Sequence, residues 1–248
     1  MELKSFFAEN NKIALAFSGG VDSAYLLYAA VSAGADVTAY YVKSQFQPEF
    51  EKRDAERLSN ELGAKMRVIS LDVLCDETIT ANPANRCYYC KRRIFMAISE
   101  AAKADGYPLI IDGTNASDDA GDRPGIRALQ ELSVRSPLRE CGITKQQVRD
   151  LSREAGLFTW NKSAYACLAT RIPAGEVITK EKLQRTEQAE EFLENLGFRD
   201  FRVRLLDGNA KLQVREEQLG LLMEKRNEIL EGLKPLYQSI LLDMEVRG

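Results

Sequence analysis

Short apolar runs alternate with segments of helical periodicity over the first two-thirds of the chain. The apolar runs predict strands at Lys12–Phe17, Val37–Val42, Lys65–Ser70, Leu109–Asp112 and Val134–Leu138. Helical periodicity predicts helices over Asp22–Ala33, Glu49–Leu62 and about Cys90–Ala104, and one from the capping box Thr144–Gln147. Strands separated by helices favour a parallel, doubly wound α/β sheet, which gathers ligands at the carboxyl ends of its strands.

The pattern changes from about Lys180. A charged helix is predicted over Glu181–Leu196, followed by a hairpin of Phe201–Leu206 and Lys211–Arg215, a second helix and a last strand near Ile240–Met244. We therefore expect two domains, residues 1–172 and a smaller α+β domain of residues 173–248, with the linker in Arg171–Thr179.

The turn between the first strand and the first helix carries Ser18, Gly19, Gly20, Val21, Asp22 and Ser23. A glycine pair there lets backbone N–H groups surround a phosphate at a helix N-terminus. The Ser18, Asp22 and Ser23 side chains suit phosphate oxygens or Mg²⁺. The turn lacks the signatures of a P-loop and of a dinucleotide-binding loop. It resembles the SGGxDS loop of the PP-loop ATP pyrophosphatases, which split ATP into AMP and pyrophosphate.

A second polar turn follows the strand at Leu109–Asp112. It consists of Asp112, Gly113, Thr114 and Asn115, and we expect it at the same sheet edge as the first loop. Its side chains are predicted to contact the nucleotide, and Asp118 or Asp119 to approach a metal.

Composition narrows the chemistry. The 248 residues are 45% hydrophobic and 29% charged, as in an ordinary globular protein, and carry a net charge of -3, which argues against a large nucleic-acid footprint. No apolar run approaches the roughly 20 residues of a membrane span and no signal peptide is evident, so we expect a cytoplasmic protein without membrane association. The absence of histidine excludes Ser-His-Asp and Cys-His catalysis.

Three of the five cysteines stand in suggestive contexts. Cys87 and Cys90 form a C-x-x-C pair, typical of a redox dithiol or of half a metal site, and Cys167 lies in a loop-like segment. Three cysteines without histidine suit an iron–sulfur cubane with one open iron better than a closed zinc site. Cys75 and Cys141 are expected to be buried and only to pack.

Several blocks occur together in one subfamily's order: SGGVDS, Arg86–Lys91, DGTN, Ser136–Leu138 and Ala166–Pro173. The chain resembles, over nearly its whole length, the ATP-dependent sulfur transferases of nickel-pincer nucleotide cofactor biosynthesis (the LarE family). The resemblance implies adenylation of a carboxylate of pyridinium-3,5-dicarboxylic acid mononucleotide, followed by sulfur transfer to give a thiocarboxylate. It implies ATP and Mg²⁺ as cofactors and catalytic roles for Asp22 and Cys167.

The family has two sulfur sources. In one version the cysteine matching Cys167 gives up its own sulfur and becomes dehydroalanine. In the other, three cysteines hold a [4Fe-4S] cluster whose open iron carries sulfide from a sulfide donor. The presence of Cys87, Cys90 and Cys167 favours the cluster version, with these three as ligands.

The smaller C-terminal domain carries the expected substrate site. Arg202 and Arg204 match the family's Arg-x-Arg and are predicted to bind the substrate phosphate from one strand face. Glu190 is expected to match a family carboxylate near that site, and Arg171 to clamp a carboxylate or phosphate. Gln213 stands where an acid is expected, which puts that acid's role in doubt. The family also implies a homo-oligomer.

Three other functions stay open at this point. A tRNA thiolase couples the same loop to three cysteines, although it favours a basic surface. An amidating ligase would have to use free ammonia, since no histidine can assist a glutaminase. A non-catalytic nucleotide or cluster sensor would bind ATP without releasing pyrophosphate.

Overall fold

The computed structural model describes residues 2–118 and 124–247, which form two compact units. The first contains residues 1–72 and 85–162, and the second contains residues 73–84 and 163–248. The predicted boundary lies at residue 172, whereas this division also assigns residues 163–172 and 73–84 to the second unit. The functional division into domains 1–172 and 173–248 stays a prediction.

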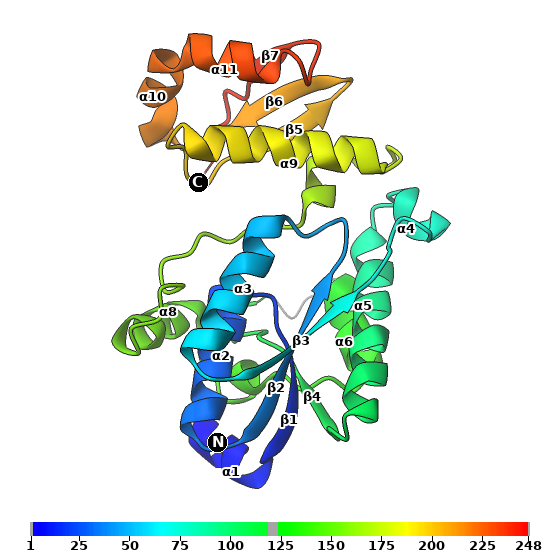
Figure 1. The fold of residues 1–248 in the computed structure, drawn as a ribbon, viewed down its shortest axis with the longest axis vertical. Helices are drawn as coiled ribbons and strands as arrows, with labels where there is room; N and C mark the ends of the chain where they lie inside the picture. Colours follow the sequence, from blue (N-terminus) through cyan, green and yellow to red (C-terminus); the bar gives the residue numbers. More distant parts are fainter. Residues whose placement is uncertain (1, 119–123, 248) are drawn as a thin grey trace. The chain divides into compact units, whose positions relative to one another are not determined.

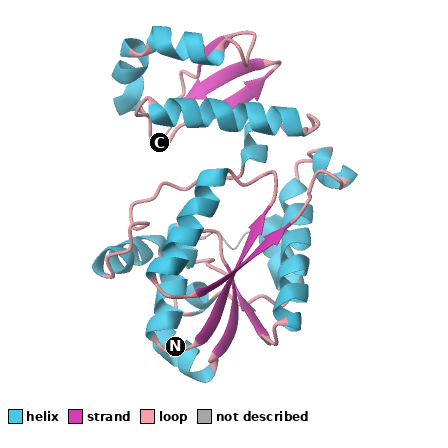
Figure 2. Ribbon diagram, viewed as in Figure 1, coloured by secondary structure: helices cyan, strands magenta, loops and turns pink. Residues whose placement is uncertain are grey.

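The first unit is built on an all-parallel sheet of order β3-β2-β1-β4 (Figures 1 and 2). Its strands are β1 (Lys12–Ala16), β2 (Asp36–Lys43), β3 (Lys65–Ser70) and β4 (Leu109–Ile111). Its helices are α1 (Leu3–Glu9), α2 (Val21–Ser32), α3 (Glu49–Glu61), α5 (Arg86–Ala104), α6 (Pro124–Glu131), α7 (Pro137–Glu140) and α8 (Lys145–Glu154). The predicted parallel α/β architecture is confirmed.

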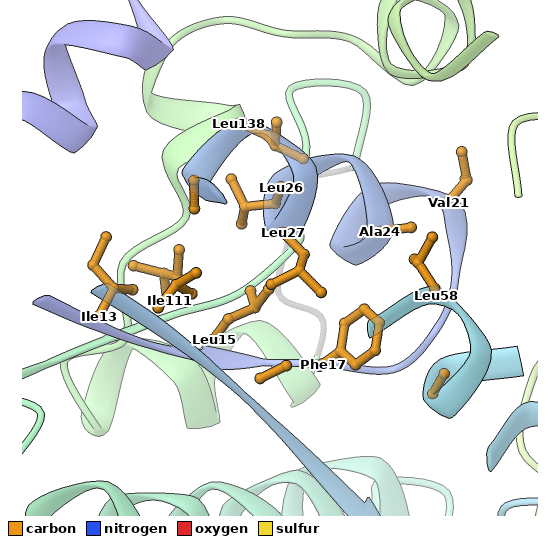
Figure 3. Close-up of a cluster of buried hydrophobic side chains, with 14 of the residues drawn as sticks. Ile13, Leu15, Phe17, Val21, Ala24, Leu26, Leu27, Leu58, Ile111 and Leu138 are labelled. Carbon is orange, nitrogen blue, oxygen red and sulfur yellow. The ribbon is translucent and has the colours of Figure 1, made fainter. Parts of the chain in front are cut away.

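Alternation along β1 divides the core into two layers. Ile13 and Leu15 point into a cluster with Leu26 and Leu27 of α2, part of which Figure 3 shows. Ala14 points to the opposite face, into a second cluster that includes residues of α5 and α6. Because both faces are covered, β1 is apolar from Ile13 to Ala16, which explains the unbroken hydrophobic run there.

The predicted strand at Val134–Leu138 is wrong. Among the described residues this segment makes only an isolated bridge, between Arg135 and Ile111, and then begins α7. Pro137 lacks the N–H that a strand ladder needs, and its fixed φ suits the first turn of a helix. Ser133, with a φ of 54°, also turns the chain just before this segment.

The helix predictions were correct in type but differ from the structure at one start and omit some helices. The helix expected from about Cys90 begins at Arg86, so both cysteines of the C-x-x-C pair are helical. The capping box is confirmed: the Thr144 hydroxyl accepts from the Gln147 backbone N–H, and the Gln147 side chain accepts from the Thr144 backbone. The helices α1 and α6 were not predicted.

The second unit contains a three-stranded sheet of order β5-β6-β7. Strands β5 (Arg202–Leu206) and β6 (Asn209–Gln213) form the predicted antiparallel hairpin, and β7 (Ile240–Leu242) pairs parallel to β6. The other elements are α4 (Glu77–Thr80), the 3₁₀ helix η1 (Leu168–Arg171), α9 (Lys180–Asn195), η2 (Glu216–Gln218), α10 (Leu219–Glu224) and α11 (Arg226–Leu233).

Hydrogen bonds connect residues 73–84 to the rest of the second unit. The Asn82 side chain donates to the carbonyl oxygen of Pro173 at 2.7 Å, and the Asn82 carbonyl accepts from the Gly175 N–H at 2.8 Å. Thr80 likewise accepts from the Ile178 N–H. No apolar pattern predicts such contacts between segments about 90 residues apart.

Candidate functional site

The loop between β1 and α2 is braced by its own serines. The Ser18 and Ser23 hydroxyl oxygens are 3.1 Å apart, and the Ser18 hydroxyl accepts from the Gly20 N–H. Ser23 also donates to the Gly20 carbonyl. Gly20 is the N-cap of α2 and has no side chain that could occupy the helix's first N–H groups, so this end of the helix suits an anion.

Gly19 is required by its surroundings. Its φ is +72°, and a Cβ there would lie 3.2 Å from the Ala55 Cβ and 3.3 Å from the Glu51 carbonyl oxygen of α3. Backbone packing against α3 therefore fixes the loop conformation.

Asp22, in the first turn of α2, is held by two donors from distant segments. The Asn115 amide donates to one carboxylate oxygen at 3.1 Å, and the Lys145 ammonium contacts the other at 2.5 Å. The DGTN turn and the SGGVDS loop thus meet directly, at the sheet edge where both were expected.

Gly113 allows the two turns to touch. A Cβ on Gly113 would lie 2.8 Å from the Ser23 nitrogen and 3.2 Å from the Asp22 Cβ. Asp112, which precedes it, is buried and accepts from the Thr114 and Ser136 hydroxyls, so its carboxylate orders the turn. Asp118 accepts from the Asn115 N–H at 2.9 Å, and Asp119 lies outside the described residues.

Two lysines near the loop were missed by sequence reasoning. Lys145 begins α8 and reaches Asp22. Lys162 contacts the Asp54 carboxylate at 2.6 Å and lies 3.4 Å from the Gly19 carbonyl oxygen. Both lie far along the chain from the loop, and neither belongs to a motif that predicts a phosphate-binding cation.

The candidate cluster ligands divide between the units. Cys87 is exposed and Cys90 buried on the first turns of α5 in the first unit, whereas Cys167 is the half-buried N-cap of η1 in the second. The Arg86 guanidinium lies 3.8 Å from the Cys87 sulfur. Among the described residues no group of three or more Cys, His, Asp or Glu has metal-binding geometry.

The expectation of two packing cysteines is wrong for Cys75, which is exposed in the second unit. Cys141, just after α7, is half-buried, and burial raises the pKa of its thiol. A short apolar context therefore did not indicate burial at Cys75.

The second unit gathers the predicted substrate residues around one carboxylate. Glu190 of α9 accepts from Arg171 Nε at 2.8 Å and Arg171 Nη2 at 3.1 Å, from the Tyr165 hydroxyl, and from the Val203 N–H at 3.0 Å. Four donors occupy the two oxygens of this buried group. The sequence indicated Glu190 and Arg171 separately and did not indicate that they pair.

The arginines of β5 contact the segment that carries Cys167. Arg202 donates to the Ala164 carbonyl at 2.6 Å, and Arg204 donates to the Thr170 carbonyl at 3.0 Å, so both project from one face of the strand as predicted. The Gln213 side chain accepts from Arg204 Nε at 3.2 Å.

Positive charge exceeds negative charge in this cluster. Burial, with Arg171 and Arg247 nearby, lowers the pKa of Arg202 to about 10 and also lowers the pKa of Arg204. Burial likewise opposes the charge on Arg171, but the hydrogen bonds and charge of Glu190 outweigh it and raise the pKa of Arg171. A bound anion would relieve the repulsion between these arginines.

A family model defines the class of protein. The model described as thiamine biosynthesis protein (ThiI) matches residues 7–194, more than half of the chain, and the chain therefore belongs to this PP-loop family. The fold agrees, since the matched region includes the whole parallel sheet and its SGGVDS loop.

Individual relatives narrow the class. The chain is 32% identical to a pyridinium-3,5-bisthiocarboxylic acid mononucleotide synthase of Lactiplantibacillus plantarum, over 94% of this chain and 86% of that protein. It is 39% identical to an uncharacterized protein of Synechocystis sp., over 88% of this chain and 81% of the relative. The LarE resemblance is confirmed, and the chain is an enzyme of the sulfurtransferase class.

A more distant relative is named for a different activity. A tRNA-specific 2-thiouridylase of Clostridium botulinum is 26% identical, over 60% of this chain and 52% of that protein. Within the described part of the chain, no helix is both long and apolar enough to cross a membrane.

Proposed function

We propose that this enzyme uses ATP and Mg²⁺ to adenylate a carboxylate of pyridinium-3,5-dicarboxylic acid mononucleotide and then replaces AMP with sulfur. The product is a thiocarboxylate, a precursor of the nickel-pincer cofactor. The observation that carries this proposal is the 32% identity to a synthase named for the pyridinium-3,5-bisthiocarboxylic acid mononucleotide. The match spans 86% of that synthase, against 52% of the 2-thiouridylase, which favours the mononucleotide over tRNA.

The loop chemistry supports adenylation. A carboxylate is a poor acyl donor, because its oxygen is a poor leaving group. Attack of a carboxylate oxygen on the α-phosphorus of ATP releases pyrophosphate and leaves AMP as the leaving group. The N-terminus of α2 and the braced Ser18–Ser23 loop suit the pyrophosphate, while Asp22 offers a carboxylate to Mg²⁺ and Lys145 a positive charge.

The sulfur step is proposed to use Cys87, Cys90 and Cys167 as ligands of a [4Fe-4S] cluster. Three thiols without histidine fit that cluster chemically. Such a cluster, when bound, would supply a sulfide on its open iron, and the sulfide would come from a separate donor. The protein's own residues then have to hold the adenylate and exclude water until sulfur displaces AMP.

A cluster-free route stays as the alternative. The Cys167 sulfur would attack the acyl carbon and expel AMP. Loss of the Cα proton and cleavage of the Cβ–S bond would then leave the thiocarboxylate and dehydroalanine at position 167. This route consumes one protein per sulfur, whereas the cluster route allows turnover.

The arginine cluster supports binding of the substrate phosphate. Arg204 is the more accessible of the β5 pair; burial and then the charges of Arg171 and Arg247 lower its pKa, and a bound phosphate would offset that repulsion. Arg171 and Glu190 are already bonded to each other. We therefore assign phosphate contact chiefly to Arg204, with Arg202 behind it and the Arg171–Glu190 pair as its support.

The first experiment measures pyrophosphate release and product mass with the mononucleotide, ATP and Mg²⁺, on protein purified without oxygen. Release that depends on the mononucleotide, with a thiocarboxylate product, is expected. Release that depends on tRNA instead would replace the proposal with the thiolase. ATP binding without release would overturn the proposed reaction altogether.

Iron analysis decides the sulfur source. We expect about four irons per chain, lost in Cys87→Ala, Cys90→Ala and Cys167→Ala. Cys141→Ala is the matched control, because Cys141 is half-buried like Cys167 but lies outside the Arg86–Lys91 and Ala166–Pro173 blocks that carry the candidate ligands. Iron-free protein that gains dehydroalanine at position 167 after one turnover would support the sacrificial route.

The cytoplasmic location and the homo-oligomeric state expected from the sequence belong to the same proposal. Sedimentation of the purified protein tests the second: a monomer at working concentration would remove the oligomer from the proposal.

A further inference from the structure

Tyr165 stands two residues before Cys167 and is enclosed by charged side chains. Arg171 and Arg202 both lie over its ring, with guanidinium carbons 4.5 Å and 5.1 Å from the ring centroid. Its hydroxyl donates to the Glu190 carboxylate at 2.5 Å. No motif in the sequence indicates a role for this tyrosine.

The arginines that stack on Tyr165 also bind the backbone on either side of it. Arg202 donates to the Ala164 carbonyl at 2.6 Å, and Arg171 donates to the Ala166 carbonyl at 2.7 Å. Arg171 also lies 3.4 Å from the Cys167 carbonyl oxygen. The tyrosine ring and its two flanking peptide groups are thus held by one set of side chains.

This set is buried, which makes its arrangement specific. Arg171, Glu190 and Arg202 are only 1%, 6% and 4% exposed. A buried ion pair that loses a partner is strongly unfavourable, and stacking of a cation on a ring is stronger when desolvated. The segment before Cys167 therefore has few alternative positions at comparable energy.

We propose that Tyr165 is a positioning residue that locks residues 164–167 onto the Arg171–Glu190–Arg202 cluster and so fixes where the Cys167 thiol is presented. The inference rests on the proposed role of Cys167 in sulfur delivery, and it holds for the cluster route and the sacrificial route alike. The SGGVDS loop and Lys145 belong to the first unit, so at saturating mononucleotide the adenylation step is expected to proceed without Tyr165. Loss of Tyr165 uncouples the two half-reactions.

The test compares Tyr165→Ala and Tyr165→Phe with Tyr237→Phe as the matched control. Tyr237 is a buried tyrosine of the same unit whose ring also stacks on an arginine, Arg185, at 4.8 Å. The first readout is hydrogen exchange of the Thr170 amide, which donates to the Cys167 carbonyl at 2.9 Å. The second is the ratio of thiocarboxylate formed to pyrophosphate released.

In Tyr165→Ala we expect Thr170 exchange about tenfold faster or more, because both the ring under the two guanidinium groups and its hydrogen bond to Glu190 are lost. At saturating mononucleotide, we expect the thiocarboxylate-to-pyrophosphate ratio to fall by a similar factor while pyrophosphate release stays within about twofold. Tyr165→Phe keeps both stacked arginines and loses only the hydrogen bond to Glu190, so each readout should lie between wild type and Tyr165→Ala. The Tyr237→Phe protein should match the wild type in both.

Unchanged Thr170 exchange in Tyr165→Ala would overturn the proposal, as would equal losses of pyrophosphate release and sulfur transfer. If Tyr165→Ala does not fold, the smaller change in Tyr165→Phe decides, and exchange identical to wild type counts against the proposal. Wild-type protein that releases no pyrophosphate would refute the proposed function instead. The exchange data from the same preparations would still decide whether Tyr165 holds the segment.

Discussion

The SGGVDS loop and the Glu190 cluster are both dense in polar groups, but they are built in opposite ways. In the loop, neighbours along the chain brace one another, and the end of α2 keeps N–H groups suited to an outside anion. In the cluster, side chains from three separate segments use their hydrogen-bonding groups on one another and on the backbone. The helix end at the loop therefore suits a ligand, whereas the hydrogen bonds of the cluster hold the backbone around Cys167.

Glu190→Ala should produce the largest effect on stability. It leaves the fully buried Arg171 cation without its carboxylate, which costs about 3–5 kcal/mol for a broken buried pair. Thermal or urea unfolding of the variant measures this. Glu191→Ala, at the exposed neighbouring position, is the control and should lie within about 0.5 kcal/mol of wild type. Equal stability of the two variants would mean that Glu190 is a ligand rather than a support.

Asp22→Asn should produce the largest effect on catalysis. Loss of this carboxylate is expected to slow pyrophosphate release about a hundredfold or more, because developing phosphate charge loses its metal-linked stabilisation. Its effect on stability should be small, since the Lys145–Asp22 pair is partly exposed. Asp150→Asn, on the exposed face of α8, makes the same charge change and should leave the rate unaltered. A normal rate in Asp22→Asn would show that the loop is not the catalytic centre.

Gly113→Ala tests whether the two turns must touch. The added methyl would overlap the Ser23 nitrogen at 2.8 Å, so the turns have to separate at a cost of about 1–3 kcal/mol. Separation of the turns should also lower the affinity for ATP, which titration calorimetry measures. Gly220→Ala in α10 is the control, because a methyl there meets nothing within 4 Å. If ATP binds normally to Gly113→Ala, close approach of the DGTN turn is not needed for the nucleotide.

The smallest expected effect is the contribution of Asp200 to the pH dependence of the free energy of unfolding. Burial raises the pKa of Asp200, but Arg247 and Arg215 outweigh it and bring the pKa below 3.8. The unfolded carboxyl takes up a proton at higher pH than the folded one, so this stabilisation is complete above about pH 4. It is lost as the pH falls through the lower folded value.

Acid unfolding of Asp200→Asn measures that contribution. The stability of the variant should change less steeply below about pH 4 than that of wild type. Asp207→Asn in the β5–β6 turn is the control, since Asp207 is exposed, and it should retain the wild-type slope. Parallel curves for wild type and Asp200→Asn would show that Asp200 adds nothing.

The strand at Lys65–Ser70 and the hairpin of β5 and β6 were predictable because their signals are local. The prediction at Val134–Leu138 failed because the apolar run there is short. Pro137 begins a helix instead, and Ser133 turns the chain just before it. At the site, the SGGVDS and DGTN motifs could be read directly, since each is a contiguous turn after a buried strand. Lys145 and Lys162 could not, because only folding brings them beside Asp22 and Gly19.

By itself, the sequence determined the parallel α/β class, the PP-loop and the LarE relationship, because each is written in contiguous residues or in the order of short blocks. The tertiary structure alone decided the partners: which donors occupy Glu190, that Arg202 and Arg204 contact the Cys167 segment, and that Tyr165 lies under two guanidinium groups. Buried polar groups must find partners wherever the fold brings them, and distance along the chain does not constrain that choice.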